Sequence, residues 1–271
     1  MCDRDLLKHS CYKLMVFMGF LDLHTSLYVG GVAGIFCIKG YVFCQWPTLW
    51  FWIGCLHGMA WKMQCSSVVL LAFNRCLEAF NPKWSNILFT GKRTLFWMIL
   101  PVLWGLRDIV FGPPVYFSPI YMTLTYDPHV GYFSDTKNMY MDPTIFYNNI
   151  FLALAVPLIY AIFGVCLHLK TKNAVIATFE QQTKIFGQIL MISALFSGIT
   201  IAFVVVQFFP LPQSYNPWLQ WIFLIFDGQP AIIYLAFNAT LRRKVMILVC
   251  FRKKSQHSVT APMVQLSINV F

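Results

Sequence analysis

Six long apolar runs, each about 19–25 residues, are the feature that most constrains how this chain can fold. A hydrocarbon core about 30 Å thick is crossed by about 20 apolar residues in a helix that rises 1.5 Å per residue. Hydrophobic residues make up 58% of the 271-residue chain and charged residues only 11%, whereas soluble domains carry roughly 25% charged residues. The runs lie at residues 14–38, 49–73, 94–112, 145–169, 185–209 and 217–238. We therefore expect an all-α membrane protein, a transmembrane helix bundle with the lipid bilayer as its solvent.

The positions of lysine and arginine orient this bundle. Sixteen of the 20 such residues precede the first run, connect the second to the third and the fourth to the fifth, or follow the sixth. Because positive charge marks cytoplasmic connections, residues 1–13 are expected to be a cytoplasmic N-terminal segment, 14–238 the bundle and 239–271 a cytoplasmic tail. The longest outer connection, about 113–144, is rich in Pro, Tyr and Asp and is either an ordered lid or a loose loop.

Other classes of protein lack support in the sequence. The net charge of +10 is not accompanied by a basic face or an RNA-binding motif, so no nucleic-acid partner is expected. The nine cysteines are scattered without a CxxC pair or a Cys/His spacing, so no metal site is expected. There is no Gly-rich phosphate loop, nucleophile elbow or HExxH motif, so we expect neither an enzyme nor a cofactor.

Asp22, Lys62 and Asp227 are ionisable residues that lie well inside predicted spans, away from the span ends. Such groups cost roughly 2.5–3.5 kcal/mol at mid-depth and usually pair or face water. Three roles are open for these residues. They form a structural polar network, in which Gln64 can reach Asp22, or they contact a ligand or ion, or they line a transport pathway. Because Lys62 lies on a different face from Arg75, a simple triad of the three is doubtful, and Lys62 either meets the next helices or has a lowered pKa.

One face of the second run gathers polar and aromatic residues. At about 100° per residue, His57, Trp61, Gln64 and Arg75 share that face. If Arg75 points into the bundle, so do His57 and Gln64. His57 lies about 27 Å from Arg75 along the helix, at the depth of a small-molecule pocket. Helix packing and interfacial hydrogen bonding are the alternative roles for all of these side chains. The further candidates near outer ends of spans are Tyr147, Asn148, Asn149, Gln207 and Gln220.

The tail begins with an apolar run, 245–251, between two basic clusters. Seven residues cannot cross a bilayer, so we expect this segment to lie on the inner leaflet, attracted to anionic lipid. Cys250 within it is a candidate for palmitoylation.

Several stretches, in their order and spacing, resemble the nematode serpentine chemoreceptors of class T (Srt), which are seven-helix G-protein-coupled receptors. They are CYKLM at 11–15, GYVFCQWP at 40–47, LLAFNRCLE at 70–78, LFTGKRTLFWMILP at 88–101, VVVQFFP at 204–210 and DGQPAIIYLAFNATLRRK at 227–244. The resemblance implies a chemosensory receptor, at the plasma membrane and in sensory cilia. Such a receptor binds a small extracellular ligand within the bundle and signals to a heterotrimeric G protein. In the family's order the first run here corresponds to helix two, so we expect six of seven spans, from a truncated receptor or an incomplete gene model.

The same resemblance implies roles for individual residues. Asn74, Arg75 and Cys76 stand where rhodopsin-like receptors have Asp-Arg-Tyr, and Arg75 would be the switch arginine; its alternative is an anchor that reaches the headgroups. Asp22 matches the second-helix acid of a polar core that would include Gln64 and Asp227.

The last span carries the remaining element of the activation switch. Pro230 and Tyr234 replace the terminal Asn-Pro-x-x-Tyr pattern, with Pro230 as an activation hinge or a static kink. The long outer loop has no cysteine to pair with Cys44.

Two other functions compete with the receptor. A transporter or channel subunit would use Asp22, Lys62 and Asp227, but no internal repeat supports it. A non-functional receptor fragment is the other alternative.

Overall fold

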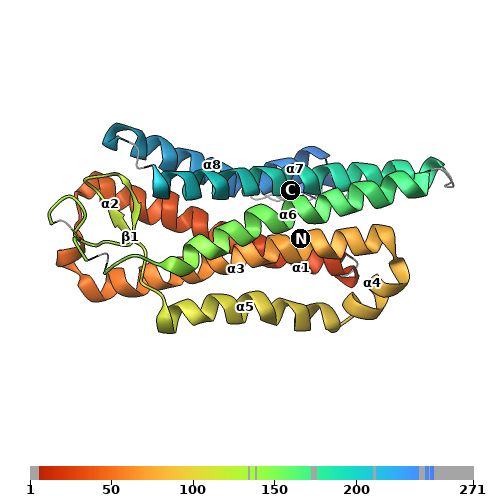
Figure 1. The fold of residues 1–271 in the computed structure, drawn as a ribbon, viewed down its shortest axis with the longest axis horizontal. Coiled ribbons are helices and arrows are strands. Elements are labelled where there is room, and N and C mark those ends of the chain that lie inside the picture. Colours follow the sequence, from red (N-terminus) through yellow and green to blue (C-terminus); the bar gives the residue numbers. More distant parts are fainter. Residues whose placement is uncertain are drawn as a thin grey trace, which may run out of the picture.

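The protein forms an elongated bundle of long helices in the computed structural model (Figure 1). The structure describes residues 6–133, 135–137, 139–171, 176–209, 212–237, 242–243 and 245–246. The long helices are α1 (Ser10–Ser26) continued by η2 (Leu27–Val32) and α2 (Ala33–Lys39), α3 (Pro47–Phe80), α5 (Arg93–Phe111), α6 (Pro143–Thr171), α7 (Ile176–Phe208) and α8 (Asn216–Phe237). The short elements are η1 (Leu6–Lys8), η3 (Phe43–Gln45), α4 (Pro82–Phe89), β1 (Tyr116–Ser118), β2 (Thr123–Thr125) and η4 (Gln213–Tyr215). Helices thus cover each of the six predicted runs.

Within the described residues, four helices are long and apolar enough to cross a membrane. These are Ser10–Lys39, Arg93–Phe111, Pro143–Val165 and Asn216–Phe237, and Leu190–Val206 of α7 is a shorter apolar stretch. Large apolar side chains such as Phe96, Phe111 and Trp218 are exposed on their outer surfaces, which suits a surface that meets lipid rather than water. The expected all-α membrane fold is confirmed.

Helix α3 is the central element of the bundle. It packs against α1, α5, α6 and α7, with α5 along one side and α7 and α8 on the opposite side of the bundle (Figure 1). Because other helices surround it, α3 buries polar residues that a lipid-facing helix would expose, among them Lys62, Gln64 and Asn74. Gly105 allows the close approach of α5, since a Cβ there would lie 2.8 Å from the carbonyl oxygen of Met59.

Local sequence explains where several helices begin and end. Pro47 and Pro82 occupy the first turns of α3 and α4, where the missing N–H costs nothing. The side chain of Asn81 accepts a hydrogen bond from the Trp84 N–H and caps α4. Gly40 ends α2 in the left-handed conformation, with φ of 64°.

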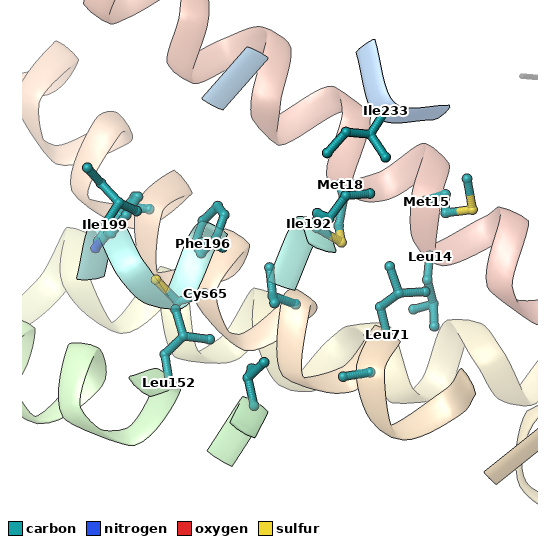
Figure 2. Packing of buried hydrophobic residues seen from close by; sticks show 14 of the residues in the cluster. Leu14, Met15, Met18, Cys65, Leu71, Leu152, Ile192, Phe196, Ile199 and Ile233 are labelled. Carbon is teal, nitrogen blue, oxygen red and sulfur yellow. The ribbon is translucent and has the colours of Figure 1, made fainter. Parts of the chain in front are cut away.

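The main hydrophobic core joins α1, α3, α6, α7 and α8 along the bundle axis. This core includes Leu14 and Met18 of α1, Leu71 of α3, Leu152 of α6 and Ile192 of α7, with Leu14 near Leu71 and Leu152 nearer to Cys65 (Figure 2). Each is less than 5% exposed, so removal of one of these side chains would leave a cavity.

The described residues of the connection between α5 and α6 form an ordered lid. The sequence had not decided between an ordered lid and a loose loop. Its strands β1 and β2 form an antiparallel hairpin in which Phe117 pairs with Leu124. Tyr116 and Phe117 are buried in a second core with Ala33, Phe36 and Trp50. The hairpin therefore covers the end of the bundle that the charge distribution predicts to face outside (Figure 1).

Candidate functional site

A cavity of about 420 Å³ lies beneath the lid, between the predicted outer ends of α3, α6, α7 and α8. Its size is within the usual range of small-molecule pockets, roughly 300–1,000 Å³. The helices contribute His57, Gly58, Trp61, Ile145, Asn149, Phe203, Val206, Leu219, Gln220 and Phe223. The lid contributes Val115, Thr123, Leu124, Thr125, Tyr126, Asp127, Asp135, Tyr140, Met141 and Asp142.

Four of the predicted pocket residues line this cavity, namely His57, Trp61, Asn149 and Gln220. Trp61 donates a hydrogen bond from Nε1 to the Oδ1 of Asn149 at 3.3 Å, and its ring stacks on Phe196. His57 is 3% exposed and stacks on Tyr28 at a centroid distance of 4.3 Å. Among the described residues nothing hydrogen-bonds to the Nδ1 of His57. One side chain of the cavity wall thus carries a buried polar atom without a hydrogen-bond partner among the described residues.

Asn148 does not line the cavity, contrary to the sequence-based expectation. It accepts a hydrogen bond from the Nε1 of Trp104 on α5 at 2.9 Å and lines a groove between α3, α5 and α6 instead. Adjacent residues on a helix point about 100° apart, and here Asn149 lines the cavity while Asn148 lines the groove. Gln207 lies in α7, and its side chain falls outside the described part of the structure.

A hydrogen bond attaches the first residues of the lid to the bundle. The hydroxyl of Tyr28 donates a hydrogen bond to the carbonyl oxygen of Val115 at 2.9 Å. Gly54 of α3 lies directly below this point, and a Cβ there would approach the same carbonyl to 2.5 Å. Only glycine allows the lid to sit this close to α3.

The lid is fastened at its end by a buried ionic cluster around Lys62. The Nζ of Lys62 lies 2.5 Å from Asp108 of α5 and 3.0 Å from Asp142, where the lid meets α6. It also donates to the hydroxyl of Thr144, which in turn hydrogen-bonds to Asp142 and accepts from Arg107. Burial acts to raise the pKa of Asp142, but hydrogen bonds from Thr144 and Lys62 and the charge of Lys62 outweigh it, so this pKa is below its ordinary value.

Lys62 therefore pairs with the next helices and not with Asp22 or Asp227. The transporter hypothesis grouped these three residues, and the structure divides them between two clusters. Sequence reasoning missed Asp108 and named Asp142 only as part of a loop. The available signal was Lys62 itself, because a lysine inside a span requires an acidic partner.

A second polar cluster links three helices near the middle of the bundle. The Nε2 of Gln64 donates to Asp22 of α1 at 2.6 Å and to Asp227 of α8 at 2.7 Å. Ser26 donates to the other oxygen of Asp227 at 2.9 Å. Gln64 and Asp22 are thus hydrogen-bonded, as the sequence had suggested, and one amide joins α1, α3 and α8.

The predicted switch residues lie at the opposite end of α3 from the cavity. Arg75 is 15% exposed and forms an ion pair with Glu78 one turn on at 2.9 Å. Asn74 donates to the hydroxyl of Ser10 at 3.1 Å. The thiol of Cys76 contacts the carbonyl oxygen of Ile159 on α6 at 3.8 Å.

The remaining predicted residues fall at or beyond the limits of the description. Pro230 is buried inside α8. Tyr234 lies one turn later in the same helix, with its side chain outside the described part. Cys250 lies outside the described residues.

Comparisons with known proteins agree with this architecture. The family model described as "Serpentine type 7TM GPCR chemoreceptor Srt" matches residues 1–258. Serpentine receptor class T-55 of Caenorhabditis elegans is 24% identical to the chain over 258 residues, which cover 92% of this chain and 68% of that protein. The bundle of apolar helices is what such a receptor requires. The chain belongs to the serpentine Srt family of seven-transmembrane G-protein-coupled chemoreceptors, multi-pass proteins of the plasma membrane.

Proposed function

We propose that this protein is a chemosensory receptor that binds a small extracellular ligand in the cavity beneath the lid and signals to a heterotrimeric G protein. The observation that carries the proposal is the arrangement along α3. His57 and Trp61 line the cavity near one end of this helix, and near the other end Asn74 contacts α1 and Cys76 contacts α6, on either side of Arg75. One rigid element therefore connects the place of binding to the place of coupling.

Ligand binding would act by shifting a conformational equilibrium. A ligand changes the populations of two states only by the difference in its affinity for them. Trp61 packs against Phe196 of α7 and Phe223 of α8, so a ligand that displaces its ring alters contacts with both helices. Gln64, one turn below Trp61, holds α1 and α8 to α3. Movement at the cavity is thereby transmitted toward Arg75.

Arg75 would release its contacts to engage the G protein in the active state. Its pairing with Glu78 is a partly exposed i,i+3 ion pair, of the kind worth only about 0–1 kcal/mol. Such a pair breaks readily when a stronger partner arrives. Pro230 would serve as the hinge of α8, because a proline within a helix leaves a carbonyl without its usual N–H partner.

The test uses the receptor in cells that report G-protein activation, with a panel of candidate odorants. We expect at least one odorant to activate the wild type and Arg75→Ala to weaken this signal while ligand binding is retained. Arg75→Lys is the matched control, since it preserves the charge that a headgroup anchor needs but not the planar guanidinium. If Arg75 were only an anchor, Arg75→Lys would signal normally and Arg75→Ala would lose surface expression rather than coupling. A panel that produces no signal, or an Arg75→Ala variant that signals fully, contradicts the proposal.

A further inference from the structure

The cavity beneath the lid is acidic in a protein that is strongly basic. The chain has 20 Lys and Arg residues against 10 Asp and Glu. Three of the ten acids, Asp127, Asp135 and Asp142, line the cavity, and no lysine or arginine is among the described residues that do. Low-dielectric walls of one charge sign concentrate ions of the opposite sign. The cavity therefore favours a cation and disfavours an anion.

Asp127 is the carboxylate best placed to meet a ligand's charge. Lys62 already compensates Asp142, and the oxygens of Asp135 accept the backbone N–H groups of Met139 and Tyr140. The Oδ1 of Asp127 accepts the backbone N–H of His129 at 2.8 Å. Among the described residues no lysine or arginine forms an ion pair with it. Its charge thus remains available on the cavity wall.

Aromatic rings form much of the remaining wall. Trp61, Tyr126, Tyr140, Phe203 and Phe223 all line the cavity. The faces of such rings attract organic cations, and their area also takes up an apolar body. A small molecule that combines a positive charge with a hydrocarbon portion satisfies both kinds of wall.

Two buried nitrogen atoms supply a second, independent sign of a polar ligand. The Nδ1 of His57, on a side chain 3% exposed, and the Nε2 of Gln220 have no hydrogen-bond partner among the described residues. Both side chains line the cavity, one from α3 and the other from α8. Buried polar groups normally have partners, so these two lining side chains carry unmet hydrogen-bonding capacity at the edge of the cavity.

We propose that the ligand of this receptor is a small organic cation, such as a protonated amine on an aromatic or aliphatic body, whose charge is met by Asp127. This inference rests on the proposed function and specifies the ligand class of the same cavity. Thr125 stabilises the position of Asp127, because its hydroxyl accepts the Asp127 backbone N–H at 3.2 Å.

The test measures binding to the purified full chain in lipid nanodiscs, without a G protein. The probes are amine, alcohol and carboxylate forms of benzyl, phenylethyl and phenylpropyl compounds, which match in size and differ in charge. At pH 7 we expect an amine to bind about tenfold or more tightly than its alcohol, and the carboxylate not to bind, since a charge-assisted contact is worth at least that factor.

Asp127→Asn should remove the preference for the amine and leave alcohol binding within about twofold. Asparagine retains the Oδ1 acceptor for His129, so the local turn persists, and retained alcohol binding verifies the fold. Lys137→Gln is the matched control, because Lys137 is an exposed charge in the same lid and does not line the cavity. If Asp127→Asn does not fold, the relative affinities of the wild type for the amine, alcohol and carboxylate probes still test whether the cavity prefers a cation.

The inference is overturned if alcohols or carboxylates bind as tightly as amines, if no amine binds, or if Asp127→Asn leaves the amine-to-alcohol ratio unchanged. A result that contradicts the receptor function can be distinguished from a result that contradicts the cation site. A neutral odorant that evokes an Arg75-dependent signal upholds the receptor and overturns the cationic ligand. Amine binding that depends on Asp127 but never activates a G protein upholds the cation site and contradicts the receptor function.

Discussion

At the scale of single residues, Lys62 shows how a buried charge is accommodated inside the bundle. Its ammonium group is completely buried and is shared between Asp108, Asp142 and the hydroxyl of Thr144. A buried ion pair adds little net stability, but removal of one partner leaves an uncompensated charge. The attachment of the end of the lid to α3 therefore depends on this side chain.

Lys62→Met should destabilise the protein by about 3–5 kcal/mol, because Asp108 and Asp142 would remain buried without their cation. Thermal unfolding in detergent can be followed by thiol labelling of the buried Cys55 and Cys65. The double variant Lys62→Met/Asp142→Asn is the control: it removes opposite charges together and leaves Asp108 beside Arg107, so it should recover much of the loss. Equal stability of the single and double variants would contradict the role of the cluster.

Asp142 should make this attachment sensitive to acid. Because its pKa is lowered in the folded protein, its stabilising effect is complete above the unfolded pKa of about 3.9 and is lost as pH falls through the lower folded value. The difference in unfolding free energy between wild type and Asp142→Asn should thus be constant from pH 7 to about 5 and shrink below about pH 4. A difference that grows on acidification would rule out this pairing.

At the scale of elements, the lid contacts the bundle at its first and last residues, and we call this line of contact the seam. The seam begins where Tyr28 and Gly54 meet Val115 and ends at the Lys62 cluster. Loops that cover a pocket set access to it, so the closeness of this contact should control ligand affinity.

Gly54→Ala should push the start of the lid away from α3, since the new methyl group would lie 2.5 Å from the carbonyl oxygen of Val115. We expect lower thermal stability and weaker ligand binding, although alanine itself favours a helix by about 1 kcal/mol. Gly34→Ala is the control, because nothing lies within 4 Å of its new Cβ. The close contact would be unimportant if Gly54→Ala were as stable as Gly34→Ala and bound ligand equally well.

At the scale of the whole molecule, the proposed function requires that the cavity and the end of α3 near Arg75 influence each other equally. His57 and Arg75 are 18 residues apart on α3, about 27 Å at 1.5 Å per residue. Linkage requires that a G protein raise agonist affinity by the factor by which agonist raises G-protein affinity, typically about 5–150-fold. Gln64 joins three helices between these two ends.

Gln64→Met should reduce this mutual effect, because the methionine cannot bridge Asp22 and Asp227. We expect the ratio of agonist affinities with and without G protein to approach one, measured by radioligand competition in the presence and absence of GTPγS. Ser66→Ala is the matched control on the same helix, since the Ser66 hydroxyl bonds only to carbonyl oxygens of α3 among the described residues. An unchanged ratio in Gln64→Met would exclude this cluster from the coupling.

The membrane class and the approximate positions of the helices follow from the length of the apolar runs. Run length is a local property, but burial on α3 is not: Lys62 is as buried as His57, Trp61 and Gln64, although it lies on another face, because other helices surround α3. The family followed from motifs in their order along the chain. Only the tertiary structure decided that the lid is ordered, that Asn148 faces away from the cavity, and that Lys62 binds Asp108 and Asp142. The reason is physical: Lys62 is separated from these partners by 46 and 80 residues, and which of several acids a buried lysine meets depends on how the helices pack.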